Sequence, residues 1–188
     1  TQRIHLKAFD IATLKEILHD HVIHYHQEDL LAFYLFTGGV AKYVELLVQA
    51  QAFTFEEILN EIISENSLFI EEGKNVLIEE FGKEYGNYFS ILSLIASGKT
   101  SRTEIESIME IQTGGFLDRL ENEYGLIKKV RPILAKPNSR TVKYSIEDNF
   151  LKFWFRFIYK YRSAVEAGNL HYLKEIVLRD YSVFSGTI

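Results

Sequence analysis

The 188-residue sequence has no cysteine and only two prolines, and these absences exclude several kinds of protein. Without cysteine the chain can form neither a disulfide nor a thiolate metal site, which is compatible with a reducing compartment. It also has no apolar run near the roughly 18 residues that a membrane-spanning helix needs. We therefore expect a cytoplasmic protein with no membrane segment.

The motifs that mark a self-contained active site are also missing. The sequence has no G-x-x-x-x-G-K-S/T phosphate loop, no G-x-G-x-x-G and no G-x-S-x-G nucleophile elbow. No Ser-His-Asp or Cys-His set can be assembled from the residues present. We predict no catalytic residue in this chain, and whether it belongs to an enzyme stays open.

Charge is distributed unevenly along the chain. The net charge is −5, and the first 98 residues hold 6 Lys/Arg against 15 Asp/Glu. In contrast, residues 126–145 hold six basic residues and no acidic one. A local basic patch on an acidic chain suggests an anionic partner more strongly than general basicity does.

Apolar periodicity predicts a mainly α protein with a small β-hairpin. Residues 1–73 read as a bundle of four helices, the last over 54–69, joined by short loops. Residues 74–147 contain a helical stretch broken near Gly82, a short helix whose Ser101 and Glu104 match a capping box, a further helix closed by Gly125, and two strand-like runs. Residues 148–188 read as two more helices that begin a third domain.

The order of these elements is informative for residues 74–147. Helix, short helix, turn, helix and two-stranded hairpin is the order of a winged helix-turn-helix. In such a domain the second helix of the turn enters the major groove and the hairpin touches the nucleic-acid backbone.

Four segments in sequence order together resemble one family: TGGVAKYVELL, SILSLIASGKTSRTEIE, GGFLDRLENEYGLIKKVRPI and NFLKFWFRFIY. They are similar to the predicted AAA+-type ATPases that are common in archaea and also occur in Bacteroidetes. Those proteins have a P-loop core, a helical lid, a winged helix and a nuclease-like C-terminal domain. The resemblance implies that residues 1–73 are the lid, 74–147 the winged helix and 148–188 the start of the last domain. Ala41 stands where related lids often have a proline.

The resemblance also implies partners that are absent from this chain. The P-loop core would lie in the missing part of the parent protein, which would bind ATP with Mg²⁺, whereas none is expected on these residues alone. Gly38, Gly39 and Lys42 would be the lid's contribution to the nucleotide site. The alternative is an ordinary turn between two helices, capped by Thr37 or Gly39.

The basic residues suggest a second candidate site. We predict that duplex DNA contacts the hairpin and its surroundings through seven cationic residues: Arg119, Lys128, Lys129, Arg131, Lys136, Arg140 and Lys143. The preceding helix is poorly suited to enter a groove because Asp118, Glu121 and Glu123 would face phosphates. Many winged helices contact only protein, so that reading stays open.

Two other clusters have simpler explanations. Four histidines between residues 19 and 26 suggest zinc, but only His21 and His24 are well spaced on a helix, so we predict no metal site. The aromatic run from Phe150 to Tyr161 follows helical periodicity and predicts a core face. Phe155 and Tyr159 lie off that stripe, which indicates burial on two sides or against another domain.

Three functions therefore remain. The chain is the regulatory part of an AAA+-type ATPase, a stand-alone winged-helix DNA-binding regulator, or an interaction module that contacts only protein. Neither the process driven by ATP hydrolysis nor the oligomeric state follows from the sequence.

Overall fold

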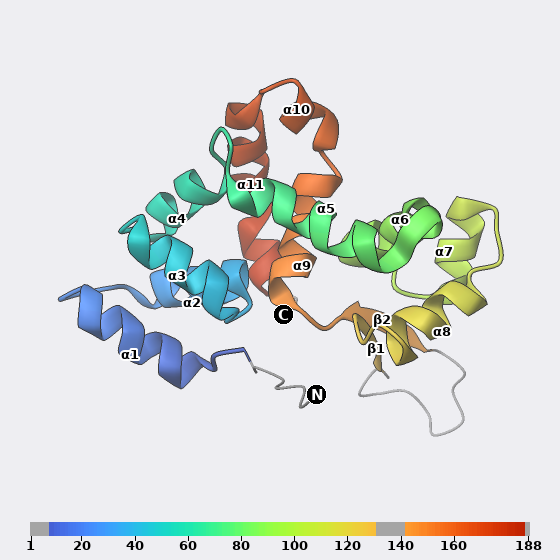
Figure 1. The fold of residues 1–188 in the computed structure, drawn as a ribbon, viewed down its shortest axis with the longest axis horizontal. Helices are drawn as coiled ribbons and strands as arrows, with labels where there is room; N and C mark the ends of the chain where they lie inside the picture. Colours follow the sequence, from blue (N-terminus) through green and yellow to red (C-terminus); the bar gives the residue numbers. More distant parts are fainter. Residues whose placement is uncertain (1–7, 131–141, 187–188) are drawn as a thin grey trace. The chain divides into compact units, whose positions relative to one another are not determined.

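The computed structural model describes residues 8–130 and 142–186, and Figure 1 shows their arrangement along the chain. The protein is mainly helical with a small two-stranded antiparallel sheet, as the sequence predicted. The chain forms two compact units. The first unit comprises residues 1–72 and 161–188, and the second unit comprises residues 73–160.

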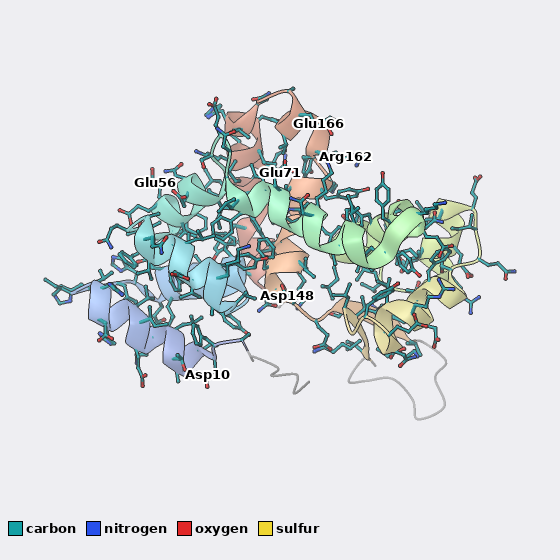
Figure 2. All side chains as sticks on the ribbon, in the orientation of Figure 1. Asp10, Glu56, Glu71, Asp148, Arg162 and Glu166 are labelled. Carbon is teal, nitrogen blue, oxygen red and sulfur yellow. The ribbon has the colours of Figure 1, made fainter. Side chains whose placement is uncertain are left out.

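The first unit is a helical bundle. Its elements are α1 (Ile11–His21), α2 (Gln27–Thr37), α3 (Ala41–Gln49), α4 (Phe55–Ile62), the start of α5 (Leu68–Phe81), α10 (Arg162–Glu166) and α11 (Leu170–Ser185). Asp10, labelled in Figure 2, begins α1. Its side chain accepts a hydrogen bond from the Thr13 N–H at 2.8 Å. Thr54 and Glu57 form a capping box at the start of α4.

The C-terminal helix belongs to this bundle. The Tyr181 ring of α11 lies 4.5 Å from the Phe55 ring and 5.8 Å from the Phe36 ring, between ring centroids. Burial raises the pKa of the Tyr181 hydroxyl to about 12. Because α11 buries its apolar stripe here, residues 161–188 group with the first unit.

A buried carboxylate ties two helix starts of this unit together. Asp29 is buried and accepts hydrogen bonds from the His26 and Phe55 N–H groups, both at 2.8 Å. It therefore caps α2 and satisfies a donor at the start of α4. An acidic side chain can be buried when such bonds replace its hydration.

The elements of the second unit follow the order that the sequence predicted. It contains the rest of α5, a 3₁₀ turn (Gly82–Glu84), α6 (Tyr85–Ala96), α7 (Arg102–Met109), α8 (Gly114–Asn122), β1 (Ile127–Val130), β2 (Lys143–Ile146), α9 (Asn149–Phe153) and a π-helical segment (Trp154–Tyr159). Strand β1 pairs with β2 in the register Ile127 to Ile146. The segment before α7 joins β2 through a Ser101–Lys143 bridge.

The stripe of the aromatic run is buried from Phe150 to Ile158 in the second unit, as its periodicity predicted, whereas Tyr161 at its end is half-buried and belongs to the first unit. Phe153 and the off-stripe Phe155 are both fully buried, which confirms burial on two sides there, whereas the off-stripe Tyr159 is half-buried. The structure differs from the expected single helix, because the chain passes through a π-helical segment and turns at residues 160–161. The Lys160 N–H bonds the Phe155 carbonyl, five residues back, which widens the helix.

Two further boundaries differ from expectation. The helix expected over 54–69 ends at Ile62, and α5 begins at Leu68 after a turn in which Asn66 has a φ of 60°. The expected third segment, 148–188, falls partly in each unit, with the division after Lys160. The breaks near Gly82 and Gly98 occur as predicted, and both glycines have positive φ.

Candidate nucleotide and nucleic-acid contacts

The first candidate site, residues 37–42, is a tight turn between α2 and α3. Gly38 ends α2 in the left-handed conformation (φ 60°), and its N–H bonds the Tyr34 carbonyl at 2.9 Å. The buried Thr37 hydroxyl accepts from the Gly39 N–H at 3.1 Å and donates to the Phe33 carbonyl at 2.6 Å. The turn therefore satisfies its own polar groups.

The glycine pair is explained by the chain's own backbone. Gly39 has a φ of 73°, and its carbonyl accepts from the Phe9 N–H at 2.7 Å. A Cβ at Gly39 would overlap the Phe9 carbonyl oxygen. The Phe9 backbone, in the segment before α1, thus makes the close approach to Gly39 that we had expected a phosphate to make.

This geometry does not fit a phosphate cradle formed by Gly38 and Gly39. Their N–H groups and that of Val40, which bonds the Thr37 carbonyl at 3.0 Å, are all engaged within the turn. Lys42 lies exposed in the first turn of α3. Of the three predicted nucleotide-contacting residues, it is the one whose position suits an anion.

The second Thr-Gly-Gly, at 113–115, begins helix α8. Thr113 is buried, and its backbone N–H bonds the Glu106 carboxylate at 2.8 Å. Arg102 also donates to Glu106, at 2.8 Å. The Thr113 bond, followed by that of Arg102, lowers the pKa of Glu106. Helices α7 and α8 are thus joined by one carboxylate.

The outward face of α8 is poorly suited to DNA. Asn122 donates to Asp118 at 2.8 Å, and both side chains are exposed. Arg119, a predicted nucleic-acid contact, instead bonds Glu84 at 3.0 Å and the Tyr88 hydroxyl at 3.1 Å. Its pKa is raised first by the Tyr88 bond and then by Glu84. Apart from Arg119, which is bonded to Glu84, the exposed polar side chains of α8 are acidic or neutral.

Two of the three described lysines of the hairpin are paired with carboxylates, and the third, Lys143, lies near one. Lys128 bonds Glu147 at 3.3 Å, and Lys129 bonds Glu121, which raises the pKa of Lys129. Lys143 lies close enough to Glu104 to help lower the pKa of that carboxyl, although the bonds from Ser101 contribute most. Arg131, Lys136 and Arg140, also predicted contacts, lie outside the described residues.

Two exposed isoleucines at the turn between α7 and α8 were not predicted. Ile108, at the end of α7, is 52% exposed, and Ile111 lies in the following turn and is also exposed. Ile105 is the one buried residue of helix α7. Helical periodicity places Ile105 and Ile108 on the same stripe, so the sequence could not show that Ile108 is exposed to solvent.

The histidine cluster makes aromatic contacts. His21 stacks on Phe53 with 5.7 Å between ring centroids, and His19 packs edge-on against Tyr25 at 5.3 Å. Across the parts of the chain that the structure describes, no group of three or more His, Asp or Glu side chains could hold a metal ion. No helix formed by residues 8–130 and 142–186 is long and apolar enough to cross a membrane.

Comparison with known proteins gives one relative of limited similarity. The chain is 28% identical, over 163 residues, to an uncharacterized protein of Methanocaldococcus jannaschii. The match covers 86% of this chain but only 36% of the archaeal protein, so the chain spans about a third of that relative. No family model and no solved structure matches the chain.

Proposed function

We propose that this chain is the regulatory, non-catalytic part of a larger AAA+-type ATP-binding protein, and that its second unit contacts duplex DNA. The observation that carries the DNA contact is the winged-helix order of the second unit, with the basic run of the chain at its hairpin. The match to one third of a longer archaeal protein supports the view that the chain works as part of a larger whole.

The contact would be made to the phosphate backbone and not to base edges. The outward face of α8 offers Asp118 and Asn122, bonded to each other, and no unengaged cation that could bond a guanine edge. The hairpin lysines are exposed, and exposed ion pairs are worth only about 0–1 kcal/mol. A phosphate can therefore replace Glu147 or Glu121 as the partner of Lys128 or Lys129.

The experiment is duplex binding by fluorescence anisotropy over a range of salt concentrations. We expect weak, sequence-independent binding that weakens with salt, since each phosphate contact contributes a slope of roughly −0.9 in log K against log salt. Replacing Lys128 and Lys129 together with glutamine should reduce the slope by nearly two such contacts. Lys42→Gln, which removes the same kind of charge from the first unit, is the matched control. Absence of binding, or equal loss in both variants, contradicts the proposal.

The nucleotide role of the first unit is supported by the family resemblance and by the position of Lys42. Since the glycine N–H groups are engaged in their own turn, the proposal rests on the lysine side chain. Lys42→Ala in the full-length parent protein should weaken nucleotide binding or turnover. Unchanged turnover would remove Lys42 from the nucleotide site.

A second candidate is a protein-contacting winged helix. It is favoured by Ile108 and Ile111, which expose apolar surface at the turn where a DNA-binding domain would present polar groups. Ile108→Ser separates the two, because it should leave duplex binding unchanged and weaken only a protein contact.

A further inference from the structure

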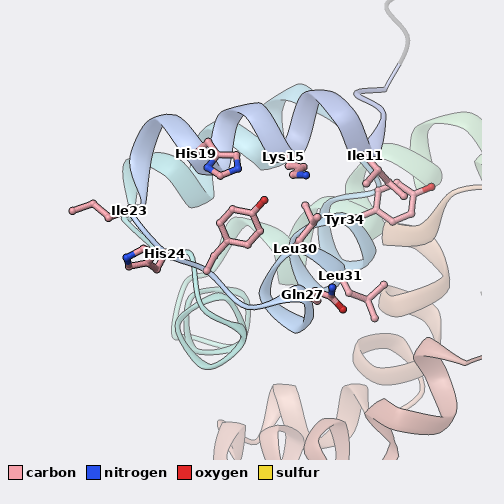
Figure 3. A pocket seen from close by; sticks show the side chains of 10 residues that line it. Ile11, Lys15, His19, Ile23, His24, Gln27, Leu30, Leu31 and Tyr34 are labelled. Carbon is pink, nitrogen blue, oxygen red and sulfur yellow. The ribbon is translucent and has the colours of Figure 1, made fainter.

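Helices α1 and α2 of the first unit enclose a surface groove with a volume of about 610 Å³ (Figure 3). Helix α1 presents residues spaced at i, i+4 and i+8, helix α2 presents residues at i, i+3, i+4 and i+7, and the connecting loop forms one end. The lining residues are Ile11, Lys15, His19, Ile23, His24, Tyr25, Gln27, Leu30, Leu31 and Tyr34. We call this surface the α1–α2 groove.

One face of α1 packs into the bundle, and a second face lines the groove. Leu14 and Leu18 point into the bundle and are fully buried. Ile11, Lys15 and His19 form a separate row along the helix, one turn apart, and face the α2 side chains across the groove (Figure 3). This row of side chains is therefore accessible to a molecule outside the bundle.

The groove is too open for an enclosed small molecule. Its loop residue Ile23 is 89% exposed and Leu31 is 40% exposed. Small-molecule sites enclose about 70–90% of the ligand surface, which would leave lining side chains less accessible than these. Apolar side chains beside an open groove between two helices are instead suited to a third helix, whose side-chain ridge packs between them.

The charge of the groove is opposite to that of its surroundings. The first unit contains 15 Asp/Glu against 7 Lys/Arg. None of the ten described residues that line the groove is acidic, whereas Lys15 is cationic. This local reversal indicates an occupant that carries negative charge beside its apolar side chains.

We propose that the α1–α2 groove binds an acidic amphipathic helical segment of a partner protein. Apolar side chains of that segment at i, i+3, i+4 and i+7 pack against Ile11, Leu31 and Ile23. A carboxylate at the edge of its apolar stripe pairs with Lys15, midway along the groove. The His19 ring, held edge-on against Tyr25, borders the contact near the loop.

The test is anisotropy titration of the 188-residue chain with a labelled helical peptide of about 16 residues. Leucines occupy one stripe of this probe and glutamates flank them. We expect micromolar affinity, weakened about tenfold by Ile23→Ser or Leu31→Gln, which each remove an apolar anchor. Lys15→Gln should weaken binding less and flatten its salt dependence. All three side chains are exposed, so circular dichroism should show an unchanged fold.

Two peptide controls and one protein control sharpen the result. A peptide with lysine for glutamate, and one of the same composition without the stripe, should bind at least tenfold more weakly. Leu178→Gln removes an apolar residue of α11 that is 57% exposed and does not line the groove, and it should change nothing. Equal binding of the three peptides, or no binding, overturns the proposal. Concentration-dependent dimerisation that Ile23→Ser abolishes also overturns it, because the occupant would then be a second copy.

Discussion

The tripeptide Thr-Gly-Gly occurs once in each unit, and the two copies build opposite ends of a helix. At 37–39 it ends α2, both glycines have positive φ, and the turn is locked against the Phe9 backbone. At 113–115 it begins α8, Gly114 lies beside the Arg102 guanidinium, and Gly115 has no neighbour where a side chain would project. Buried threonine is common to both.

The difference shows that neighbouring residues, and not the tripeptide, determine the conformation. Thr37 follows ten helical residues, so its hydroxyl bonds back to Phe33 and forward to Gly39. Thr113 follows a loop that leaves α7 at Glu110, so its N–H points toward Glu106. The polar groups of the first copy are hydrogen-bonded within its own turn, whereas the Thr113 N–H of the second copy is bonded to a side chain of another helix.

The largest effect that can separate the two copies is expected from Gly39→Ala. A methyl group there would overlap the Phe9 carbonyl and force a positive φ on alanine. We expect a loss of more than about 3 kcal/mol in the free energy of unfolding, measured by urea denaturation.

Gly115→Ala is the matched control for that substitution. Alanine finds open space at Gly115 and favours the helix, so stability should stay the same or rise by up to about 1 kcal/mol. Equal losses in both variants would contradict the assignment of a strained turn to the first copy alone.

A smaller difference is expected when each threonine is replaced by valine. Thr37→Val leaves the Gly39 N–H buried without an acceptor, which should cost about 1–3 kcal/mol. Thr113→Val removes a hydroxyl that lies 3.5 Å from Glu106 and keeps the backbone bond, so it should cost less than about 1 kcal/mol. Thermal or urea unfolding measures both, and a reversed order would show that the hydroxyl of Thr37 is not the acceptor that stabilises its turn.

Local signals were sufficient to predict much of the second unit. The Ser101–Glu104 capping box and the stops at Gly82 and Gly98 follow from residues within a few positions of one another, and the two strands follow from the β-branched residues of their own segments. The buried aromatic run was also predicted, because its large apolar side chains recur with helical periodicity. These features need no knowledge of distant segments.

Features that depend on distant residues could not be predicted. Packing of α11 on the first bundle rests on Tyr181 meeting Phe36 and Phe55, which periodicity within α11 does not reveal. The partners of the predicted cations are similarly remote: Glu84 lies 35 positions from Arg119 and Glu147 lies 19 from Lys128. Sequence located the basic residues of the candidate site but not the carboxylates that pair with the described ones.

The smallest predicted effect concerns acid, because only the second copy depends on a titratable group. The Thr113 N–H and Arg102 hold the pKa of Glu106 below its usual value, so the folded state releases that proton more readily than the unfolded state. Its stabilising contribution is complete above the unfolded pKa of about 4.3 and is lost as pH falls through the lower folded value.

The stability deficit of Glu106→Gln relative to the native chain should therefore shrink as pH falls from 7 toward 3, in thermal melts at each pH. The deficit of Thr37→Val should stay constant over the same range, since no ionisable group takes part in its bonds. A Glu106→Gln deficit that did not change with pH would mean that Thr113 and Arg102 bond the protonated acid as well as the carboxylate, and the dependence of the second turn on charge would be wrong.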